Sequence, residues 1–178
     1  MLNQSINMLW TLASFVVVGS YWGDYLAENE SLWSLYTIIV ISIVAYSIPN
    51  QWLSAIALST KRQTYERIGI RIVLWLVQNG KLVSRIEKAW SSKSRSNMSF
   101  KRVAAHLKAI AIAERFHCSC FVFFGLSTVS ALSIGKVRAA LFITLWNILY
   151  NVYPILLQQY IRLRINNIIA HRLSSESS

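Results

Sequence analysis

Charged residues are scarce in this chain of 178 amino acids. Asp, Glu, Lys and Arg together make up 14% of it, whereas soluble domains carry about 25%. Hydrophobic residues make up 54%, and long stretches contain no charge at all. The shortage of charge and the uncharged runs together indicate an integral membrane protein rather than a soluble globular domain.

Four largely uncharged stretches are candidate membrane spans. A helix needs about 20 apolar residues to cross the hydrocarbon core of a bilayer. The candidates are about 7–22, 31–49, 114–134 and 139–161. We interpret the first as a retained span, because it lacks the basic flank and the small-residue cleavage site of a signal peptide. The expected fold class is therefore an all-α integral membrane protein with about four transmembrane helices.

Acidic residues are few, and the basic residues are unevenly placed. The chain has 7 acids and 18 bases, which gives a net charge of +11. Twelve of these bases lie in region 61–108, whereas the loop 24–30 contains three acids and no base. The positive-inside rule places region 61–108 in the cytoplasm and the loop outside. With four spans, we expect a multi-pass protein of the cell membrane with cytoplasmic N- and C-termini.

A protein this basic could bind nucleic acid, but the apolar spans favour a different counter-charge. Anionic lipid headgroups attract each base near the membrane surface by about 1 kcal/mol. We therefore expect membrane lipids as partners and no nucleic acid. The sequence leaves the oligomeric state open.

Cysteine is nearly absent. Cys118 and Cys120 are too close in the sequence for an unstrained disulfide. They border the predicted cytoplasmic face, where thiols stay reduced. They also lack the further ligands of a zinc motif, so we interpret them as packing residues and expect no metal site.

The segment between the second and third spans differs from the rest. Within it, residues 64–90 place apolar and basic side chains at helical spacing, which is typical of amphipathic helices lying in the membrane interface. Asn79-Gly80 predicts a turn between two such helices. Ser99 could cap a helix that starts near Phe100.

We expect one membrane domain, residues 1–165, with region 61–108 as its cytoplasmic interfacial part. Residues 166–178 would form a C-terminal tail. The tail ends in a Ser-rich stretch from Leu173 to Ser178, which we expect to be disordered.

Glu114 and His117 form a first candidate site at the start of the third span. They are three residues apart, so they share one face of a helix. Ionisable groups beside hydrocarbon are costly, and this makes a functional role the default interpretation. A carboxylate beside an imidazole fixes its tautomer, the usual arrangement for a general base. The alternative is a salt-bridged helix end. We predict His117 and Glu114 as catalytic residues, with Glu114 orienting His117.

A second candidate site lies in the fourth span and at its end. Asn147, Asn151, Gln158 and Arg162 step by four, seven and four residues, so they would form one stripe along a helix. Helix packing by the amides and phosphate contact by the arginines are the alternatives to substrate binding. Pro154 should kink the helix and free a carbonyl near position 150. The predicted substrate-binding residues are Asn147, Asn151, Tyr153, Gln158, Tyr160, Arg162 and Arg164.

A short turn at 134–138 would make the last two spans antiparallel neighbours. The start of the third span and the end of the fourth would then lie at the same membrane face. We therefore expect the two clusters to converge in one site on the cytoplasmic side.

These residues also carry a family resemblance. The paired motifs resemble the signature of the glycosyl-4,4'-diaponeurosporenoate acyltransferase family, and the segments 65–71 and 79–85 are similar to the family's region before them. The resemblance covers roughly 60–165, and the sequence departs from the family pattern at Gln159 and Ile161. The motifs are Ala113-Glu114-x-x-His117 and Asn151-x-Tyr153-Pro154-x-x-x-Gln158-x-Tyr160-x-Arg162-x-Arg164.

The resemblance implies a membrane O-acyltransferase that moves a fatty acyl chain onto a hydroxyl of a lipid or glycolipid. For the family, the named acceptor is a carotenoid glycoside, which points to carotenoid biosynthesis. We expect no cofactor, with acyl-CoA or an acyl carrier as donor and a lipophilic acceptor as second substrate. The alternative is a non-catalytic membrane scaffold or a lipid-binding subunit. The sequence identifies neither donor nor acceptor.

In the acyltransferase interpretation each cluster has a chemical task. His117 would deprotonate the acceptor hydroxyl. Asn151 and Gln158 would position the acceptor or polarise the thioester carbonyl. Arg162 and Arg164 would bind a phosphate of the donor at the cytoplasmic surface.

Overall fold

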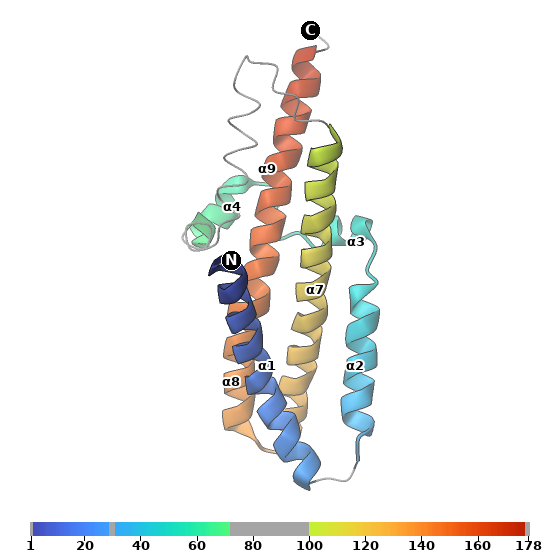
Figure 1. Cartoon of the computed structure of the whole chain (residues 1–178), viewed down its shortest axis with the longest axis vertical. Coiled ribbons are helices and arrows are strands. Elements are labelled where there is room, and N and C mark those ends of the chain that lie inside the picture. Colours follow the sequence, from blue (N-terminus) through green and yellow to red (C-terminus); the bar gives the residue numbers. More distant parts are fainter. Residues whose placement is uncertain (1, 29–30, 72–99, 177–178) are drawn as a thin grey trace. The chain divides into compact units, whose positions relative to one another are not determined.

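The computed structural model describes residues 2–28, 31–71 and 100–176, and within these residues all regular secondary structure is helical (Figure 1). This confirms the all-α class. The helices are α1 (Leu2–Glu28), α2 (Trp33–Tyr46), α3 (Asn50–Ala55), α4 (Arg62–Arg67), α7 (Phe100–Ser133), α8 (Val137–Asn147), the π-helical turn η1 (Ile148–Val152) and α9 (Tyr153–Glu176).

The chain divides into two compact units. Unit 1 comprises Met1–Pro49 and Arg115–Ile155. Unit 2 comprises Asn50–Glu114 and Leu156–Ser178. The helices α7 and α9 each contribute residues to both units. The prediction of a single membrane domain over 1–165 stays a prediction.

In unit 1, helix α1 is tied to α7 by hydrogen bonds between side chains. The hydroxyl groups of Tyr21 and Ser130 are 2.7 Å apart, and the indole Nε1 of Trp22 donates to Ser127 Oγ at 3.0 Å. Hydroxyl-bearing residues of this kind commonly link helices inside membranes. The hydrophobic effect does not drive helices together there, because lipid tails are as apolar as the side chains. The two bonds therefore fix which face of α1 meets α7.

Helix α2 is attached to α7 through backbone carbonyls near its C-terminal end. Ser119 Oγ donates to the carbonyl of Ser42 at 2.6 Å, and Arg115 Nε donates to the carbonyl of Ile48 at 2.9 Å. Arg115 thereby satisfies a carbonyl just after the end of α2 that no longer has an intrahelical donor.

The core of unit 1 is small and apolar. It gathers side chains from α1, α2, α7 and α8, and α8 packs against α1. The buried cluster consists of Val18, Tyr21, Trp22, Ile38, Phe124, Ala131, Ala140 and Ile143. Cys118 and Cys120 are also buried in this unit.

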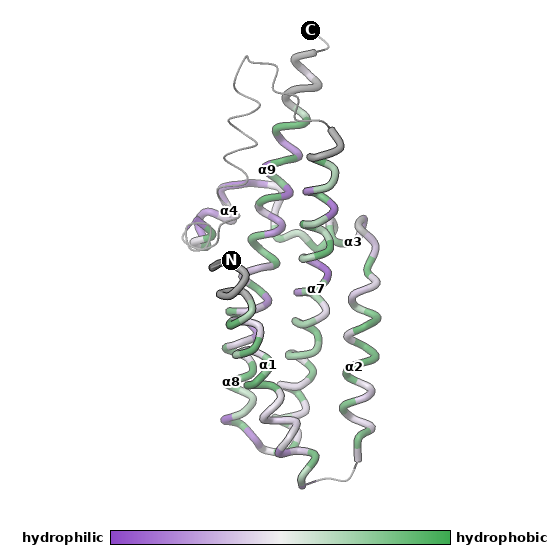
Figure 2. Tube along the Cα trace, in the orientation of Figure 1, coloured by the Kyte–Doolittle hydropathy of each residue, from purple (hydrophilic) through white to green (hydrophobic). Residues whose placement is uncertain are grey.

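The outside of unit 1 is strongly apolar as well. On α2 only Ile38 and Ser42 are buried, while Ile43 and Val44 are 61% and 67% exposed. Figure 2 shows α2 white to green along most of its length, whereas α4 is largely purple. Exposed apolar surface on this scale is costly in water and marks contact with lipid or another protein.

Two helical stretches are long and apolar enough to cross a membrane, Val103–Ser133 and Val137–Ala170. The first covers the predicted third span except for its last residue, and the second contains the predicted fourth span. Helix α1 extends beyond the predicted 7–22 at both ends, and the helical part of the predicted second span is Trp33–Tyr46. The total of four spans stays a prediction.

The predicted amphipathic helix from residue 64 is interrupted early. Helix α4 ends at Arg67, and Gly69 follows with φ +84°, a left-handed conformation that glycine adopts most easily. The spacing of apolar residues gave no sign of this break. The predicted turn at Asn79-Gly80 and the Ser99 cap lie outside the described residues, while the start of α7 at Phe100 agrees with the prediction.

The predicted turn between the last two spans is confirmed. Helix α7 ends at Ser133 and is followed by Gly135 at φ +75°, where Gly135 N–H donates to the Leu132 carbonyl and Lys136 N–H to that of Ala131. This is the Schellman arrangement, in which a left-handed glycine satisfies the last carbonyls of a helix. Helix α8 then begins at Val137.

The C-terminal segment differs from the expected tail. Helix α9 continues through residue 166 and ends at Glu176, so the Ser-rich stretch is helical up to that point. The prediction relied on serine content, whereas a preformed helix of this length can extend into polar residues at little cost per residue.

Candidate functional site

His117 lies half-buried on the part of α7 that belongs to unit 1. Its Nδ1 is 3.5 Å from the Oδ1 atom of Asn151 in η1. Its ring contacts the ring of Tyr150 edge-on, with centroids 5.5 Å apart. The histidine is therefore held by residues of the π-helical turn η1, which continues helix α8.

Two buried amides continue from this contact. Asn151 Nδ2 donates to Asn147 Oδ1 at 2.9 Å, and Asn147 Nδ2 donates to the backbone carbonyl of Phe121 at 3.2 Å. Asn151 is fully buried, and Asn147 is 6% exposed. We call this set, His117, Asn151, Asn147 and the Phe121 carbonyl, the amide chain. It begins and ends on α7.

The π-helical turn at Ile148–Val152 ends two residues before Pro154. Proline has no N–H and crowds the carbonyl four residues before it, here that of Tyr150. A π-helical turn is a common way to absorb such a disruption. The predicted free carbonyl near position 150 stays a prediction. The prediction of one stripe from Asn147 to Arg162 assumed a regular α-helix without such a turn.

Glu114 belongs to unit 2 and is fully buried. Arg162 Nη1 donates to its Oε2 at 2.6 Å, and Arg162 Nη2 donates to the Leu53 carbonyl at 3.0 Å. Removing one partner of such a buried pair would leave an uncompensated charge. The salt-bridged alternative weighed for Glu114 therefore has a specific partner, which is Arg162.

Gln159 connects this pair to the segment before α4. Its Oε1 accepts from the backbone N–H of Leu58 at 3.1 Å and from the Tyr65 hydroxyl at 3.2 Å. Its amide also interacts with the Glu114 carboxyl. Gln159, where the sequence departs from the family pattern, is therefore built into the packing of unit 2.

A second ionic cluster in unit 2 surrounds Glu66 on α4. The Tyr160 hydroxyl donates to Glu66 Oε1 at 3.0 Å, Arg62 Nε donates to the same oxygen at 2.6 Å, and Arg71 contacts Oε2 at 2.9 Å. The hydrogen bond from Arg62 is the main reason that the pKa of Glu66 is lowered. Arg164 places its guanidinium 5.7 Å from the centre of the Tyr160 ring.

The predicted site residues thus fall into two groups. Unit 1 contains His117, Asn147, Asn151 and the half-buried Tyr153. Unit 2 contains Glu114, the buried Gln158 and Tyr160, and the half-buried Arg162 and Arg164. Glu114 and His117 share helix α7, and the convergence of the two groups in one site stays a prediction.

Sequence reasoning missed several residues that hold these groups. Tyr65 and Glu66 bind Gln159 and Tyr160, and the Phe121 and Leu53 carbonyls end the two sets of contacts. A backbone acceptor carries no sequence signal. Glu66 did carry one, since it is an acid within a basic segment.

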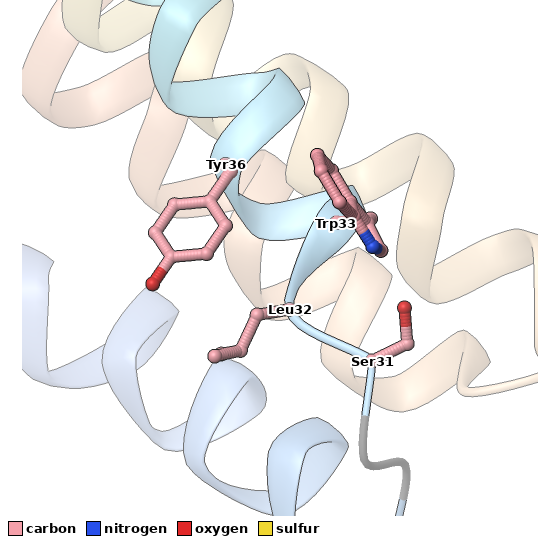
Figure 3. A pocket seen from close by; sticks show the side chains of 4 residues that line it. All are labelled: Ser31, Leu32, Trp33 and Tyr36. Carbon is pink, nitrogen blue, oxygen red and sulfur yellow. The ribbon is translucent and has the colours of Figure 1, made fainter.

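An open pocket of about 520 Å³ lies at the start of α2, in unit 1 (Figure 3). Its lining consists of Ser31, Leu32, Trp33 and Tyr36, so it contains none of the predicted site residues. Among the residues that the structure describes, no three His, Cys, Asp or Glu side chains are grouped closely enough to hold a metal ion.

The described part of the chain is all-α and contains two apolar helical stretches long enough to cross a membrane. A histidine contacts a buried amide, and a buried carboxylate pairs with a guanidinium. These features define a small membrane protein with buried polar groups. The family model for glycosyl-4,4'-diaponeurosporenoate acyltransferase matches residues 49–171, and the chain belongs to this family. No curated protein and no solved structure matches it.

Proposed function

We propose that this protein is a membrane O-acyltransferase that transfers a fatty acyl chain from a thioester donor to a hydroxyl of a lipid or glycolipid. Membership of the acyltransferase family supports the reaction class. The observation that carries the proposal is the contact between His117 Nδ1 and Asn151 Oδ1, because it orients an imidazole inside the matched region. The acceptor in the family's name, a glycosylated carotenoid, is our first candidate for the acceptor.

In the proposed reaction, His117 acts as the general base. One ring nitrogen takes the proton of the acceptor hydroxyl while that oxygen attacks the carbonyl carbon of the thioester. The tetrahedral intermediate collapses with cleavage of the C–S bond. The imidazolium then returns the proton to the departing thiolate, so the products are an ester and a free thiol. No cofactor enters this sequence.

The second group of residues would serve the reaction less directly. We propose that Glu114, paired with Arg162, holds the cytoplasmic part of α7 in place, and that Tyr153 and Gln158 contact the acceptor. Arg162 already donates to Glu114 and Leu53. Arg164, whose guanidinium lies beside the Tyr160 ring, is our second candidate contact for a donor phosphate.

The test compares lipids from cells that express the protein with those from cells that lack it. We expect a lipid class whose mass increases by one acyl chain. His117→Gln should reduce its amount by at least about 100-fold, the usual contribution of a general base. His106→Gln, on the same helix but outside the proposed site, should have no effect. Full product formation by His117→Gln at equal protein levels would refute the mechanism.

A further inference from the structure

We infer that Asn147 and Asn151 are positioning residues that fix His117 as its Nδ1–H tautomer and leave Nε2 as the basic nitrogen. This inference rests on the proposed function for its catalytic meaning, but the tautomer itself is a property of the free protein. It differs from the substrate-binding role that their spacing predicts. The argument follows the amide chain from Phe121 to the ring.

The Phe121 carbonyl determines how the Asn147 amide is oriented. A backbone carbonyl can only accept a hydrogen bond, so the group facing it at 3.2 Å must be the amino group of Asn147. The Oδ1 atom of Asn147 then points to the other side, toward Asn151.

The same reasoning carries over to the next residue. Asn147 presents an acceptor to Asn151 at 2.9 Å, so Asn151 must direct its amino group toward it. Its own Oδ1 is then the atom that faces the histidine ring. Inverting either amide would place like groups against each other in a buried environment, and unpaired buried polar groups are costly.

The ring nitrogen that faces this acceptor must be a donor. Asn151 Oδ1 faces Nδ1 of His117 at 3.5 Å, so Nδ1 carries the proton in the neutral ring. The distance is long, as hydrogen bonds of catalytic groups often are before a substrate binds. With Nδ1 protonated, Nε2 holds the lone pair, and the proton of an acceptor hydroxyl would arrive there.

This arrangement needs no carboxylate partner for the histidine. A neutral amide fixes the ring without adding a negative charge inside an apolar helix pair, where an unpaired carboxylate would be expensive. The orientation originates in a backbone carbonyl of α7 itself. It is therefore set by the packing of α7 against α8 and η1.

Nitrogen NMR of the full chain in detergent, labelled with ¹⁵N-histidine and measured at a pH where the rings are neutral, tests the inference. The His117 signals are identified by their loss in His117→Gln. We expect a protonated Nδ1 and an unprotonated Nε2. If the Nε2–H tautomer predominates in the unsubstituted protein, the inference is wrong, whatever the acyl-transfer assay shows.

Variants of Asn147 test the origin of the effect. Asn147→Leu frees the Asn151 amide to invert, so the fraction of the Nε2–H tautomer should rise several-fold. Asn147→Asp should keep the original tautomer, because an oxygen still faces the amino group of Asn151 in either protonation state. An unchanged tautomer ratio in folded Asn147→Leu would overturn the inference that Asn147 orients the Asn151 amide.

Ser119→Ala is the matched control for these variants. It removes a polar contact of α7 in the same unit, the bond to the Ser42 carbonyl, without touching the amide chain. Its tautomer ratio should equal that of the unsubstituted protein. If Asn147→Leu does not fold, the unsubstituted protein and Asn147→Asp decide the question. If the unsubstituted protein shows the expected tautomer but no acyl transfer, the result would count against the proposed function alone.

Discussion

Two sets of linked polar side chains in this protein end on backbone carbonyls. His117, Asn151 and Asn147 end on Phe121 in unit 1, and Glu114 and Arg162 end on Leu53 in unit 2. A carbonyl can only accept, so it fixes the direction of every donor that leads to it. The amide chain carries no charge, whereas the Glu114–Arg162 pair carries two that cancel.

The buried pair makes a prediction about stability at the residue scale. Arg162→Met leaves the fully buried Glu114 carboxylate without its guanidinium and should lower the free energy of unfolding by about 3–5 kcal/mol. Thermal unfolding in detergent measures the change. The double variant Glu114→Leu with Arg162→Met should recover most of the loss, because no charge is then left unpaired.

Arg62→Met provides the control for this experiment. It breaks the ion pair with Glu66, in which the Arg62 side chain is 48% exposed, so the change should be small. A loss for Arg62→Met as large as that for Arg162→Met would show that burial is not the cause.

At the scale of elements, glycine and proline decide where the helices change. Pro154 lies two residues after a π-helical turn, and Gly135 and Gly69 occupy left-handed positions after α7 and α4. Pro154 and the turn at Gly135 were predictable, since their local chemistry is specific. The break at Gly69 was not, because the apolar and basic pattern continues through it.

Gly135 and Gly19 give opposite predictions for the same substitution. Gly135→Ala forces a side chain into a left-handed conformation and should destabilise the protein by about 1–2 kcal/mol. Gly19→Ala lies inside α1 with nothing within 4 Å of the added methyl group, so it should be neutral or slightly stabilising. Melting temperatures in detergent check both. Equal effects of the two substitutions would contradict the assigned turn.

At the scale of the whole molecule, composition and family agree on a membrane protein. Two helices have membrane-spanning length, and α1, α2, α7 and α8 expose large apolar side chains. The chain belongs to an acyltransferase family by residues 49–171. The number of spans rests on the uncharged stretches and the side of each loop on charge placement, and an accessibility experiment can test both directly.

Cysteine labelling with a membrane-impermeant maleimide measures the topology. The background is Cys118→Ala with Cys120→Ala, which removes both native thiols. Asp24→Cys, in the predicted outer loop, should be labelled in intact cells, whereas Thr60→Cys should be labelled only after permeabilisation. Both positions are exposed in the structure. Labelling of both in intact cells, or the reverse pattern, would exclude the four-span orientation.

The sequence by itself determined the all-α class, the apolar helices, the turn at Gly135 and the disturbance at Pro154. These follow from composition, run length and residues with restricted backbones, all of which act locally. The motifs that resemble the acyltransferase signature also identified His117 and Asn151 before any contact was known.

Only the tertiary structure decided which groups pair. It joined His117 to Asn151 and Glu114 to Arg162, and it brought Tyr65 and Glu66 to the residues of α9. The physical reason is that a hydrogen bond depends on the distance and direction between groups far apart in the chain. Its acceptors here include backbone carbonyls, which every residue possesses and which the sequence therefore cannot distinguish.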